Sequence, residues 1–195
     1  AQAIISELSK EWKVSGSHTG KRQSGANEYI FNNQITFDPK ILNDVTHILI
    51  SIPPNDDGDP VFLSFIESIK NLSKLKWIGY FSSSSVYGDH QGNWVTENSS
   101  VDPSNYLGKN RLIAEGQWLK SGLPVNIMRL SAIYGPGRSV IESIRAEIAM
   151  RVLKENHYFS RIHVEDISKI VRLMMDSFIP GEIYNIADDL PSAQH

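Results

Sequence analysis

The segment Val45–Ile52, VTHILISI, decides the fold. It is a near-continuous run of β-branched and other apolar residues of strand length, which is typical of a strand buried on both faces of a parallel sheet. The Pro-, Asp- and Gly-rich turn Pro53–Pro60 ends it, and Val61–Leu72 follows with apolar residues at helical spacing. A buried strand that leads into an amphipathic helix is the first half of a βαβ unit.

The same alternation extends in both directions along the chain. Strands separated by helices of this length predict an α/β fold with a Rossmann-type, doubly wound and mostly parallel sheet. The predicted strands are Trp12–Ser17, Tyr29–Phe31, Lys76–Ser82, Leu123–Leu130 and Glu182–Ile186. The predicted helices are Ala1–Lys10, Asn105–Lys120, Val140–Leu153 and Glu165–Phe178.

The bulk properties exclude several classes of function. The 195 residues fit one domain, and a net charge of −3 gives no reason to expect nucleic acid or an anionic membrane as partner. The absence of cysteine excludes disulfides and thiolate chemistry, and it fits a reducing compartment. Apolar runs such as Thr46–Pro54 are too short to span a bilayer. We therefore expect a cytoplasmic domain with a small-molecule partner.

The two ends of the sequence indicate a fragment. Ala1–Lys10 reads as the middle of a helix, and Ile183–His195 stops just after a strand and an acidic turn. The first strand of a Rossmann fold and its Gly-x-Gly-x-x-Gly phosphate loop would precede Ala1. The fragment is thus expected to lack both, and a short native terminus at each end is the alternative.

Ligands of such sheets bind beyond the carboxyl ends of the strands. The segments to inspect are therefore His18–Arg22, Ile52–Asn55, Ser82–Gly88 and Ser131–Gly137. The most specific of them lies in the run Phe81–Gly88, FSSSSVYG, whose hydroxyls can hydrogen-bond a substrate oxygen while the small side chains leave room for a nicotinamide ring. An ordinary serine-rich turn is the alternative.

Three segments carry a family resemblance. Ser82–Gly88, Arg129–Arg138 (RLSAIYGPGR) and Arg161–Ile167 (RIHVEDI) occur in the order found in the extended short-chain dehydrogenase/reductases, which include the nucleotide-sugar epimerases and dehydratases. The resemblance implies an oxidoreductase or epimerase that binds NAD or NADP and acts on a hydroxylated, sugar-like substrate, for example a nucleotide-sugar. It also implies a homodimer through the helix Asn105–Lys120.

The catalytic pattern of this family is matched in part. The family places a Ser or Thr four positions before the Tyr of Val-Tyr-Gly, which is Ser83 here, and this hydroxyl orients the substrate oxygen. The family also has a Tyr-x-x-x-Lys pair on the next helix, where the lysine charge lowers the pKa of the tyrosine. Here Tyr106 is present, but the residue four positions later is Asn110.

A second alignment of this helix starts from Ala114-Glu115, which match the family's downstream Ala-Glu. It places Arg111 at the lysine position and Leu107 at the tyrosine position. Neither alignment gives the full pair, as in the atypical branch of the superfamily. The predicted catalytic residues are therefore Ser83, Tyr106 and Arg111. A non-catalytic dinucleotide-binding module, acting as a redox sensor or a structural partner, is the alternative function, and Tyr106 as an ordinary surface residue is the alternative for that position.

The predicted cofactor site begins in the basic loop after the first predicted strand. That loop holds two cations and no carboxylate, which favours the 2′-phosphate of NADP over the 2′-hydroxyl of NAD, although a solvated turn is the alternative. The resemblance adds the segment beside the adenosine and pyrophosphate, the serine strand and the turn beside the nicotinamide. The predicted cofactor-binding residues are Thr19, Lys21, Arg22, Ser51, Ile52, Pro53, Ser82, Arg111 and Ser131.

Other candidates receive structural interpretations. Asp56, Asp57 and Asp59 lack the spacing of a calcium loop and are predicted to form a solvated turn, and the histidines show no metal-binding spacing. The loop around Trp94, with Asp89 on one side and Glu97 on the other, is a candidate for the substrate mouth, as loops often carry function. Residues 137–159 are predicted to form part of a small cap on the substrate side of a single domain, 1–195.

Overall fold

The computed structural model describes residues 2–20, 27–32, 34–149 and 158–193. The helices are α1 (Gln2–Leu8), α2 (Pro60–Lys70), α3 (Tyr106–Leu119), α4 (Val140–Arg145) and α5 (Val164–Asp176), with short 3-10 turns at Pro39–Leu42 and Ser84–Val86. The strands are β1 (Gly16–His18), β2 (Glu28–Ile30), β3 (His47–Ile50), β4 (Trp77–Ser83), β5 (Val125–Leu130), β6 (Ala132–Tyr134), β7 (Tyr158–Phe159), β8 (Arg161–His163), β9 (Ile183–Ile186) and β10 (Ser192–Ala193).

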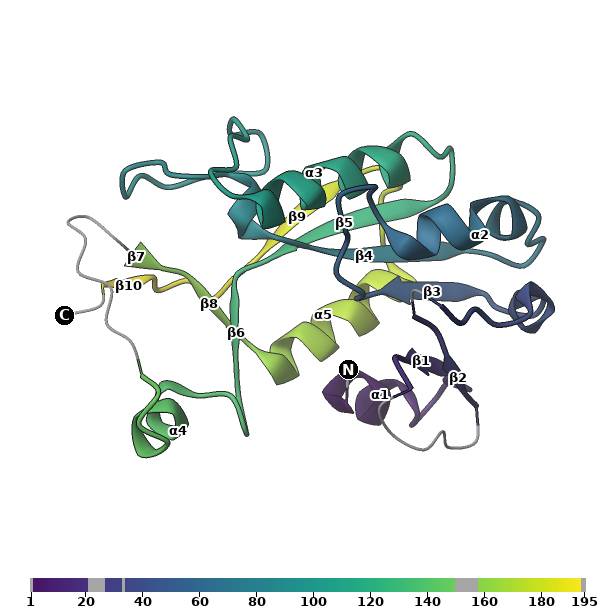
Figure 1. Ribbon diagram of the computed structural model, residues 1–195, viewed down its shortest axis with the longest axis horizontal. Coiled ribbons are helices and arrows are strands. Elements are labelled where there is room, and N and C mark those ends of the chain that lie inside the picture. The colour runs from purple at the N-terminus through teal and green to yellow at the C-terminus, as the bar shows by residue number, and fades with distance from the viewer. Residues whose placement is uncertain (1, 21–26, 33, 150–157, 194–195) are drawn as a thin grey trace.

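The centre of the molecule is a four-stranded sheet in the order β3-β4-β5-β9, and every pair in it is parallel. Helices α2 and α3 cover one face of this sheet, and α1 and α5 cover the other (Figure 1). Two helical layers around a parallel sheet are the doubly wound arrangement, so the structure confirms the predicted Rossmann-type fold.

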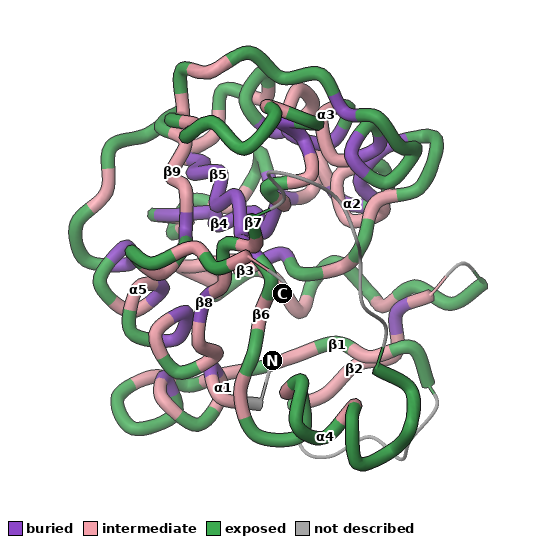
Figure 2. Tube along the Cα trace, turned by 90° about the vertical axis from the view of Figure 1, so that its left-hand side faces the viewer, coloured by how far each residue is buried: buried purple, intermediate pink, exposed green. Residues whose placement is uncertain are grey.

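Alternate residues of β4 pack into the two halves of the core, one on each face of the sheet. Ile78 and Tyr80 pack in the cluster with α2 and α3, whereas Trp77 and Phe81 pack in the cluster with α1 and α5. This alternation follows from the two-residue period of a strand. Figure 2 shows the result: β4 and β5 form the buried centre, and residues become more exposed toward the periphery.

Gly79 of β4 is required by close packing. A Cβ at this position would lie 2.3 Å from the ring of Trp77 and 2.7 Å from the side chain of Met128. The same Trp77 ring donates a hydrogen bond from Nε1 to Asn126 Oδ1 at 3.0 Å, so its one polar atom is satisfied in the core. Gly79 thus leaves room for the Trp77 ring on this face of the sheet.

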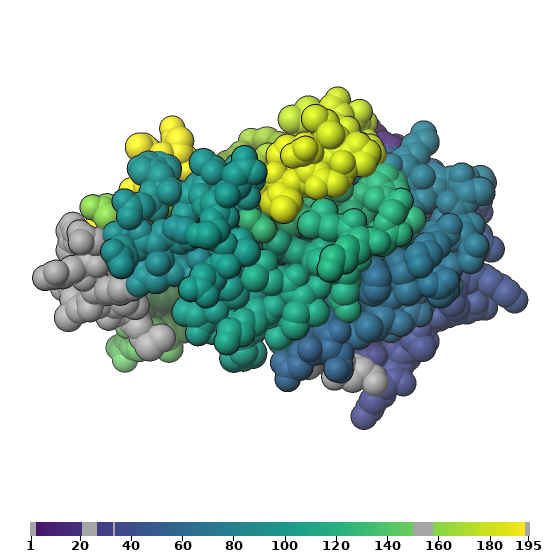
Figure 3. Space-filling view, turned by 90° about the horizontal axis from the view of Figure 1, so that it is seen from above, coloured from purple at the N-terminus to yellow at the C-terminus, as the bar shows by residue number. Residues whose placement is uncertain are grey.

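Helices α2 and α3 lie side by side on one surface (Figure 3). Each begins where a side chain accepts a hydrogen bond from a first-turn amide: Asp59 from the Phe62 amide, and Asn105 from the Gly108 amide. Pro60 occupies the first turn of α2, where a missing N–H costs nothing. The ring of Phe62 packs edge-on against Trp118, with 5.1 Å between centroids, which joins the two helices.

Two expectations about the elements are wrong. The segment Val45–Ile52 was expected to be buried on both faces, but in β3 only Ile50 is buried, because β3 lies at the edge of the four-stranded sheet. The first predicted strand, Trp12–Ser17, is displaced along the chain: β1 spans Gly16–His18 and pairs with β2 in a separate two-stranded parallel sheet.

The helix expected over Val140–Leu153 is also shorter than predicted. Helix α4 ends at Arg145, and Glu147 just beyond it has a positive φ of 57°, which a helix cannot continue through. The apolar side chains of Val140, Ile141 and Ile144 are exposed, and Figure 2 draws α4 mostly in the colour of exposed residues. Residues 150–153 of that prediction lie outside the described residues.

Candidate active site

A cavity of about 890 Å³ opens at the carboxyl ends of β4, β5 and β9. This volume is in the range of small-molecule sites. Its walls come from the loop after β4, the start of α3, the residues after β5, strand β7 and the residues after β9. The lining residues are Ser84, Ser85, Tyr87, Gly88, Asp89, His90, Gly92, Asn93, Trp94, Val95, Ser104, Asn105, Arg129, Ser131, Ala132, Tyr158, Phe159, Ser160, Asn185, Ala187, Asp188 and Pro191.

A buried ion pair lies behind the cavity. Arg129 of β5 donates from Nε to Glu115 Oε1 at 3.1 Å and from Nη2 to Glu115 Oε2 at 2.7 Å. Ser82 Oγ donates to Glu115 Oε1 at 2.5 Å, and all three side chains are almost fully buried. Burial alone would lower the pKa of Arg129, but its hydrogen bonds to Glu115 and Tyr87 raise that pKa above its ordinary value. Arg129 therefore carries its positive charge at any physiological pH.

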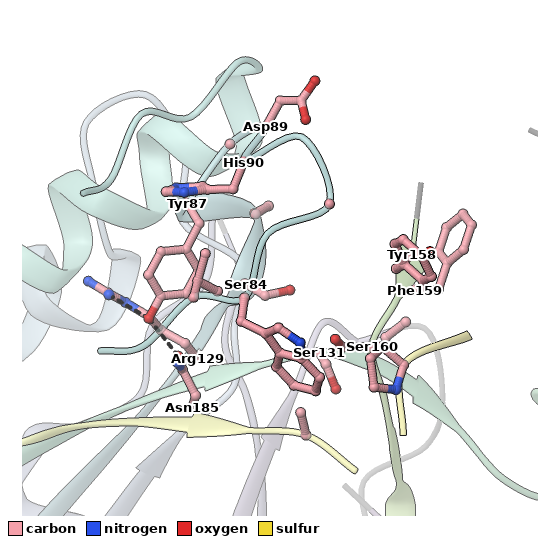
Figure 4. Close-up of a pocket in the computed structure, with 18 of the residues that line it drawn as sticks. Ser84, Tyr87, Asp89, His90, Arg129, Ser131, Tyr158, Phe159, Ser160 and Asn185 are labelled. Carbon is pink, nitrogen blue, oxygen red and sulfur yellow. Dashed lines mark hydrogen bonds between the residues drawn. The ribbon is translucent and has the colours of Figure 1, made fainter. Parts of the chain in front are cut away.

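The ion pair continues to the cavity wall. Arg129 Nη1 donates to Tyr87 Oη at 3.0 Å, and Tyr87 Oη donates to Asn185 Oδ1 at 2.6 Å (Figure 4). The backbone N–H of Asn185 donates to Glu97 Oε1 at 2.7 Å, which attaches the long loop after β4 to β9. One polar chain thus joins α3, three strands and the loop that walls the cavity.

The serine run turns sharply at the end of β4. Ser83 Oγ accepts from the Ser85 amide at 3.2 Å and caps the 3-10 turn Ser84–Val86. Ser84 and Ser85 line the cavity, whereas Ser83 is half-buried and does not. The catalytic role predicted for Ser83 stays a prediction, and the structure places the two following hydroxyls at the cavity wall.

Helix α3 favours the second of the two alignments. Arg111 donates from Nη1 to the Phe81 carbonyl oxygen at 2.5 Å, and Glu115 one turn later reaches Arg129, so both face the sheet. At 3.6 residues per turn, Leu107 follows this face and Tyr106 is turned away from it. The Tyr106 side chain is 68% exposed, and neither residue lines the cavity. The proton-transfer role predicted for Tyr106 stays a prediction.

Arg111 lies under the cavity region rather than in its wall. Besides its bond to β4, its Nη1 donates to Tyr80 Oη at 3.3 Å, and the guanidinium lies 5.9 Å from the centroid of the Tyr80 ring. Burial raises the pKa of Tyr80, so this phenol stays protonated. The contacts of Arg111 therefore stabilise the packing of α3 against β4.

The predicted cofactor residues divide into three groups. Ser131 is 7% exposed and lines the cavity, and its hydroxyl oxygen has no hydrogen-bond partner. Ser82 is committed to Glu115, and the segment Ser51–Pro53 follows β3 at the same edge of the sheet. Thr19 follows β1, and its carbonyl oxygen accepts from Asn32 Nδ2 at 2.9 Å. The two cations predicted to favour NADP, Lys21 and Arg22, lie outside the described residues.

The orphaned hydroxyl tests whether the cavity fits a nicotinamide. A buried polar group without a partner is unusual in a folded protein, and one that faces a cavity is available to a ligand. Ser131 presents such a hydroxyl beside the hydroxyls of Ser84 and Ser160, and Figure 4 shows these residues on two sides of one space. The residues present therefore fit the nicotinamide end of a dinucleotide.

The prediction that Asp56, Asp57 and Asp59 form a solvated turn before α2 is wrong for one of the three. Asp56 and Asp57 are exposed, as expected of a solvated turn, but Asp59 is fully buried. Its Oδ1 caps α2, while its Oδ2 has no hydrogen-bond partner. Burial raises the pKa of this carboxyl to about 6. The spacing of the three aspartates could not reveal this, because burial of Asp59 depends on the packing of α2 against α3.

The sequence interpretation did not assign roles to four residues of the polar chain: Tyr87, Glu115, Arg129 and Asn185. The sequence contained a signal for Arg129 and for its need of an acidic partner, which is Glu115. Arg129 interrupts an otherwise apolar strand, and a charge in a buried strand requires a buried partner of opposite sign. Nothing local singles out Asn185, because its role comes from the pairing of β5 with β9.

Comparison with known proteins identifies the family of the chain. Residues 63–187 match the model of the NAD dependent epimerase/dehydratase family. The chain belongs to this family. It is 28% identical over 201 residues to Protein YeeZ of Escherichia coli K12, which covers 93% of this chain and 71% of that protein.

Two solved structures extend the comparison. A functionally unknown conserved protein from Silicibacter pomeroyi DSS is 33% identical, with a TM-score of 0.87 over 97% of this chain and 69% of that one. UDP-glucuronic acid 4-epimerase from Bacillus cereus, in complex with NAD, shares the fold with a TM-score of 0.71 at 19% identity, over 97% of this chain and 75% of that one. None of the helices in the described part of the chain has the length and apolar content that crossing a membrane requires.

Proposed function

We propose that the protein binds NAD or NADP and oxidises, reduces or epimerises a hydroxylated, sugar-like substrate in the cavity at the carboxyl ends of β4, β5 and β9. Nucleotide-sugars belong to this class of substrate. One observation carries the proposal: the cavity combines the unpartnered hydroxyl of Ser131 with hydroxyls from the serine turn after β4. The chain belongs to an NAD-dependent family, so hydroxyls in this cavity are suited to hold a nicotinamide and a substrate oxygen.

The residues have separate tasks in this proposal. Ser131 would hold the nicotinamide end of the cofactor, which supplies hydride transfer when bound. Ser84 and Ser85 would hold a substrate hydroxyl, with Ser83 orienting their turn through its bond to the Ser85 amide. The Arg129–Tyr87–Asn185 chain would fix the wall against which the substrate lies. The basic loop Thr19–Arg22 supports a preference for NADP.

The test is a reaction assay on the protein with NAD⁺ and NADP⁺ in turn. Aldoses, cyclitols and nucleotide-sugars are offered, oxidation is followed by the absorbance of the reduced nicotinamide, and epimerisation by NMR of the sugar. Ser131→Val should reduce turnover by about tenfold or more, whereas Ser121→Val, a hydroxyl in the turn after α3, should leave it unchanged. Failure of every substrate class with both cofactors would contradict an enzymatic function.

The residues in the first turns of α3 support a second function, that of a non-catalytic dinucleotide-binding module. Tyr106 is exposed, Leu107 stands on the face where the family has its tyrosine, and Arg111 is bonded to β4. A non-catalytic dinucleotide sensor or structural module has this combination of an intact fold and an altered catalytic pair. This non-catalytic function predicts that the protein binds the cofactor but shows no turnover in the assay above.

A further inference from the structure

The long loop between β4 and α3, residues 88–104, supplies part of the cavity wall. His90 and Trp94 are among the lining residues that it contributes. Its two ends meet beside the sheet, because the Asp102 amide donates to the Tyr87 carbonyl oxygen at 3.3 Å. A Cβ on Gly88, which has a φ of 76°, would lie 1.9 Å from the Asp102 carbonyl oxygen. The base of the loop is therefore tightly closed.

Hydrogen bonds inside the loop form two further turns. Asn93 donates from its amide and from Nδ2 to the His90 carbonyl oxygen, at 3.0 and 2.9 Å. The Thr96 amide donates to Ser99 Oγ at 2.8 Å, and the Ser99 amide donates back to the Thr96 carbonyl oxygen at 2.9 Å. These bonds join the loop to itself, so they give it shape without fixing it to the sheet.

Glu97 joins the middle of the loop to the sheet. Its Oε1 accepts from the backbone N–H of Asn185 in β9 at 2.7 Å. β9 is the outermost strand in the order β3-β4-β5-β9, and an outermost strand presents backbone groups that no neighbouring strand takes up. A backbone N–H bonds more strongly to a carboxylate than to a neutral acceptor. Glu97 thus fixes the edge strand at one defined residue.

Asn185 is also held through its side chain. Its Oδ1 accepts from Tyr87 Oη at 2.6 Å, and Tyr87 Oη accepts from Arg129, the residue paired with Asn185 in the register of β5 and β9. Figure 4 shows these three side chains together on one side of the cavity. Tyr87 at the start of the loop and Glu97 in its middle therefore hold the same residue of β9.

The next residue of β9 holds the hydroxyl proposed for the cofactor. The Ile186 carbonyl oxygen accepts from the Ser131 amide at 3.0 Å. Ser131 is buried, lines the cavity and has an unpartnered hydroxyl. Because Asn185 and Ile186 are adjacent in one strand, a displacement of β9 at Asn185 also displaces the carbonyl group that holds Ser131.

We propose that Glu97 is a positioning residue for the cofactor: it holds the end of β9, and through Ile186 the Ser131 hydroxyl, where the nicotinamide is received. The same bond ties this position to the loop that carries Trp94, so the cavity wall and the cofactor hydroxyl are set together. The inference rests on the proposed function, in which Ser131 holds the nicotinamide end, and it adds to that task a residue outside the cavity lining.

Hydrogen exchange of backbone amides, followed by NMR on the protein without cofactor, tests the bond itself. Glu97→Ala should speed exchange of the Asn185 amide by about tenfold or more, because the acceptor is lost. Glu97→Gln keeps an acceptor oxygen and should stay within about threefold of the unaltered protein. The Leu63 amide of α2, which donates to the Asp59 carbonyl oxygen, reports any general loss of stability. Unchanged exchange of Asn185 in Glu97→Ala, or an equal acceleration at Leu63, would overturn the proposal.

Calorimetric titration with NAD⁺ and with NADP⁺ tests the consequence for the cofactor. Glu97→Ala should weaken binding by about three- to tenfold, and Glu97→Gln should restore it to within about twofold of the unaltered protein. Asn98→Ala changes the exposed neighbouring residue of the same loop and is the matched control, with no expected change in affinity. Binding that Glu97→Ala leaves unchanged would overturn the role in cofactor positioning.

A double variant separates positioning from a general structural role. Because Glu97 acts through Ser131, adding Glu97→Ala to Ser131→Val should weaken binding by less than about twofold further. Fully additive losses would overturn the proposal. Absence of binding of either cofactor to the unaltered protein would contradict the proposed function and the cofactor role of Glu97 with it, whereas the exchange experiment still decides whether Glu97 fixes β9.

Discussion

Two buried carboxylates, Glu115 of α3 and Asp59 at the start of α2, differ in their partners. Glu115 is 3% exposed, and both of its oxygens accept hydrogen bonds from Arg129, with a further bond from Ser82. Asp59 is 0% exposed; one of its oxygens caps α2, and the other has no partner. Burial is the same in the two cases. The difference shows that the partners, and not depth alone, decide whether a buried charge supports the structure.

The two carboxylates also serve different parts of the molecule. Glu115 supports the polar chain that ends at the cavity wall in Tyr87 and Asn185. Asp59 joins α2 to α3, since its amide donates to Gln117 Oε1 at 2.8 Å. The nearby Trp118 Nε1 also lacks a hydrogen bond of ordinary length, although its interaction with the Asp59 carboxyl lowers the pKa of that carboxyl against the larger effect of burial. Glu115 thus belongs to a fully hydrogen-bonded network beside the cavity. Asp59 belongs to a contact between two helices in which some buried polar atoms lack an ordinary hydrogen bond.

The largest effect is expected from Glu115→Ala. This change leaves the buried guanidinium of Arg129 without its counter-charge, which should lower the free energy of unfolding by about 3–5 kcal/mol. Denaturant unfolding measures it. Glu67→Ala removes an exposed carboxylate that pairs with Lys70, so it should change stability by less than about 0.5 kcal/mol. Equal losses in both variants would contradict the importance of the buried network.

Asp59 should make stability depend on pH in the direction opposite to a salt-bridged carboxylate. Between its ordinary pKa of 3.8 and its folded-state pKa of about 6, the folded protein holds a proton that the unfolded chain has released. The free energy of unfolding therefore falls as pH rises through this window, by about 2–3 kcal/mol. Asp59→Asn should remove this contribution while keeping a residue that caps well.

The measurement compares unfolding free energies at pH 4.5 and 7.5, so a constant offset from the substitution cancels. Asp57→Asn changes an exposed neighbour and is the control. An unchanged difference between the two pH values in Asp59→Asn would refute the raised pKa of this carboxyl.

The charge of Arg111 acts on Asp59, and its removal gives a smaller, directional effect. Its positive charge lowers the pKa of Asp59, in opposition to the larger effect of burial. Arg111→Met should therefore shift the midpoint of the pH-dependent stability upward. Lys109→Met removes an exposed cation from the same helix and should not move that midpoint. A downward shift would show that Arg111 does not act on Asp59.

The smallest effect is expected at the exposed end of α3. Tyr106→Phe should change turnover by less than about twofold, since the phenol lies outside the cavity lining. General acid–base catalysis by this hydroxyl would instead make the variant slower by a factor on the order of 10² or more. Steady-state kinetics with any substrate found in the assay separates the two, and a loss of that size would establish the predicted catalytic role of Tyr106.

The sequence predicted most of the fold because the signals are local. Helices α2, α3 and α5 and strands β4, β5 and β9 lie where periodicity placed them, since each carries its own apolar pattern. Helix α4 ended early because Glu147 adopts a positive φ, which periodicity cannot detect. The exposure of β3 depends on its place in the strand order, which is a property of the whole sheet.

The candidate site was predictable in its location but not in its contacts. The residues after β4 and β5 do line one cavity, as the rule for parallel sheets implies. The bond between Glu115 and Arg129 joins a helix to a strand, and that of Tyr87 to Asn185 joins residues 98 positions apart. Contacts of this kind follow from tertiary packing, so no local pattern contains them. Lys21 and Arg22, on which the NADP preference depends, lie outside the described residues.

The most direct test of the central claim is a calorimetric titration of the protein with NAD⁺ and with NADP⁺, in parallel with Ser131→Val. The account predicts one site for at least one of the two cofactors, and an affinity that falls by about fivefold or more when the unpartnered hydroxyl of Ser131 is removed. Absence of binding by both cofactors, or binding that Ser131→Val leaves unchanged, would contradict the placement of the nicotinamide in this cavity.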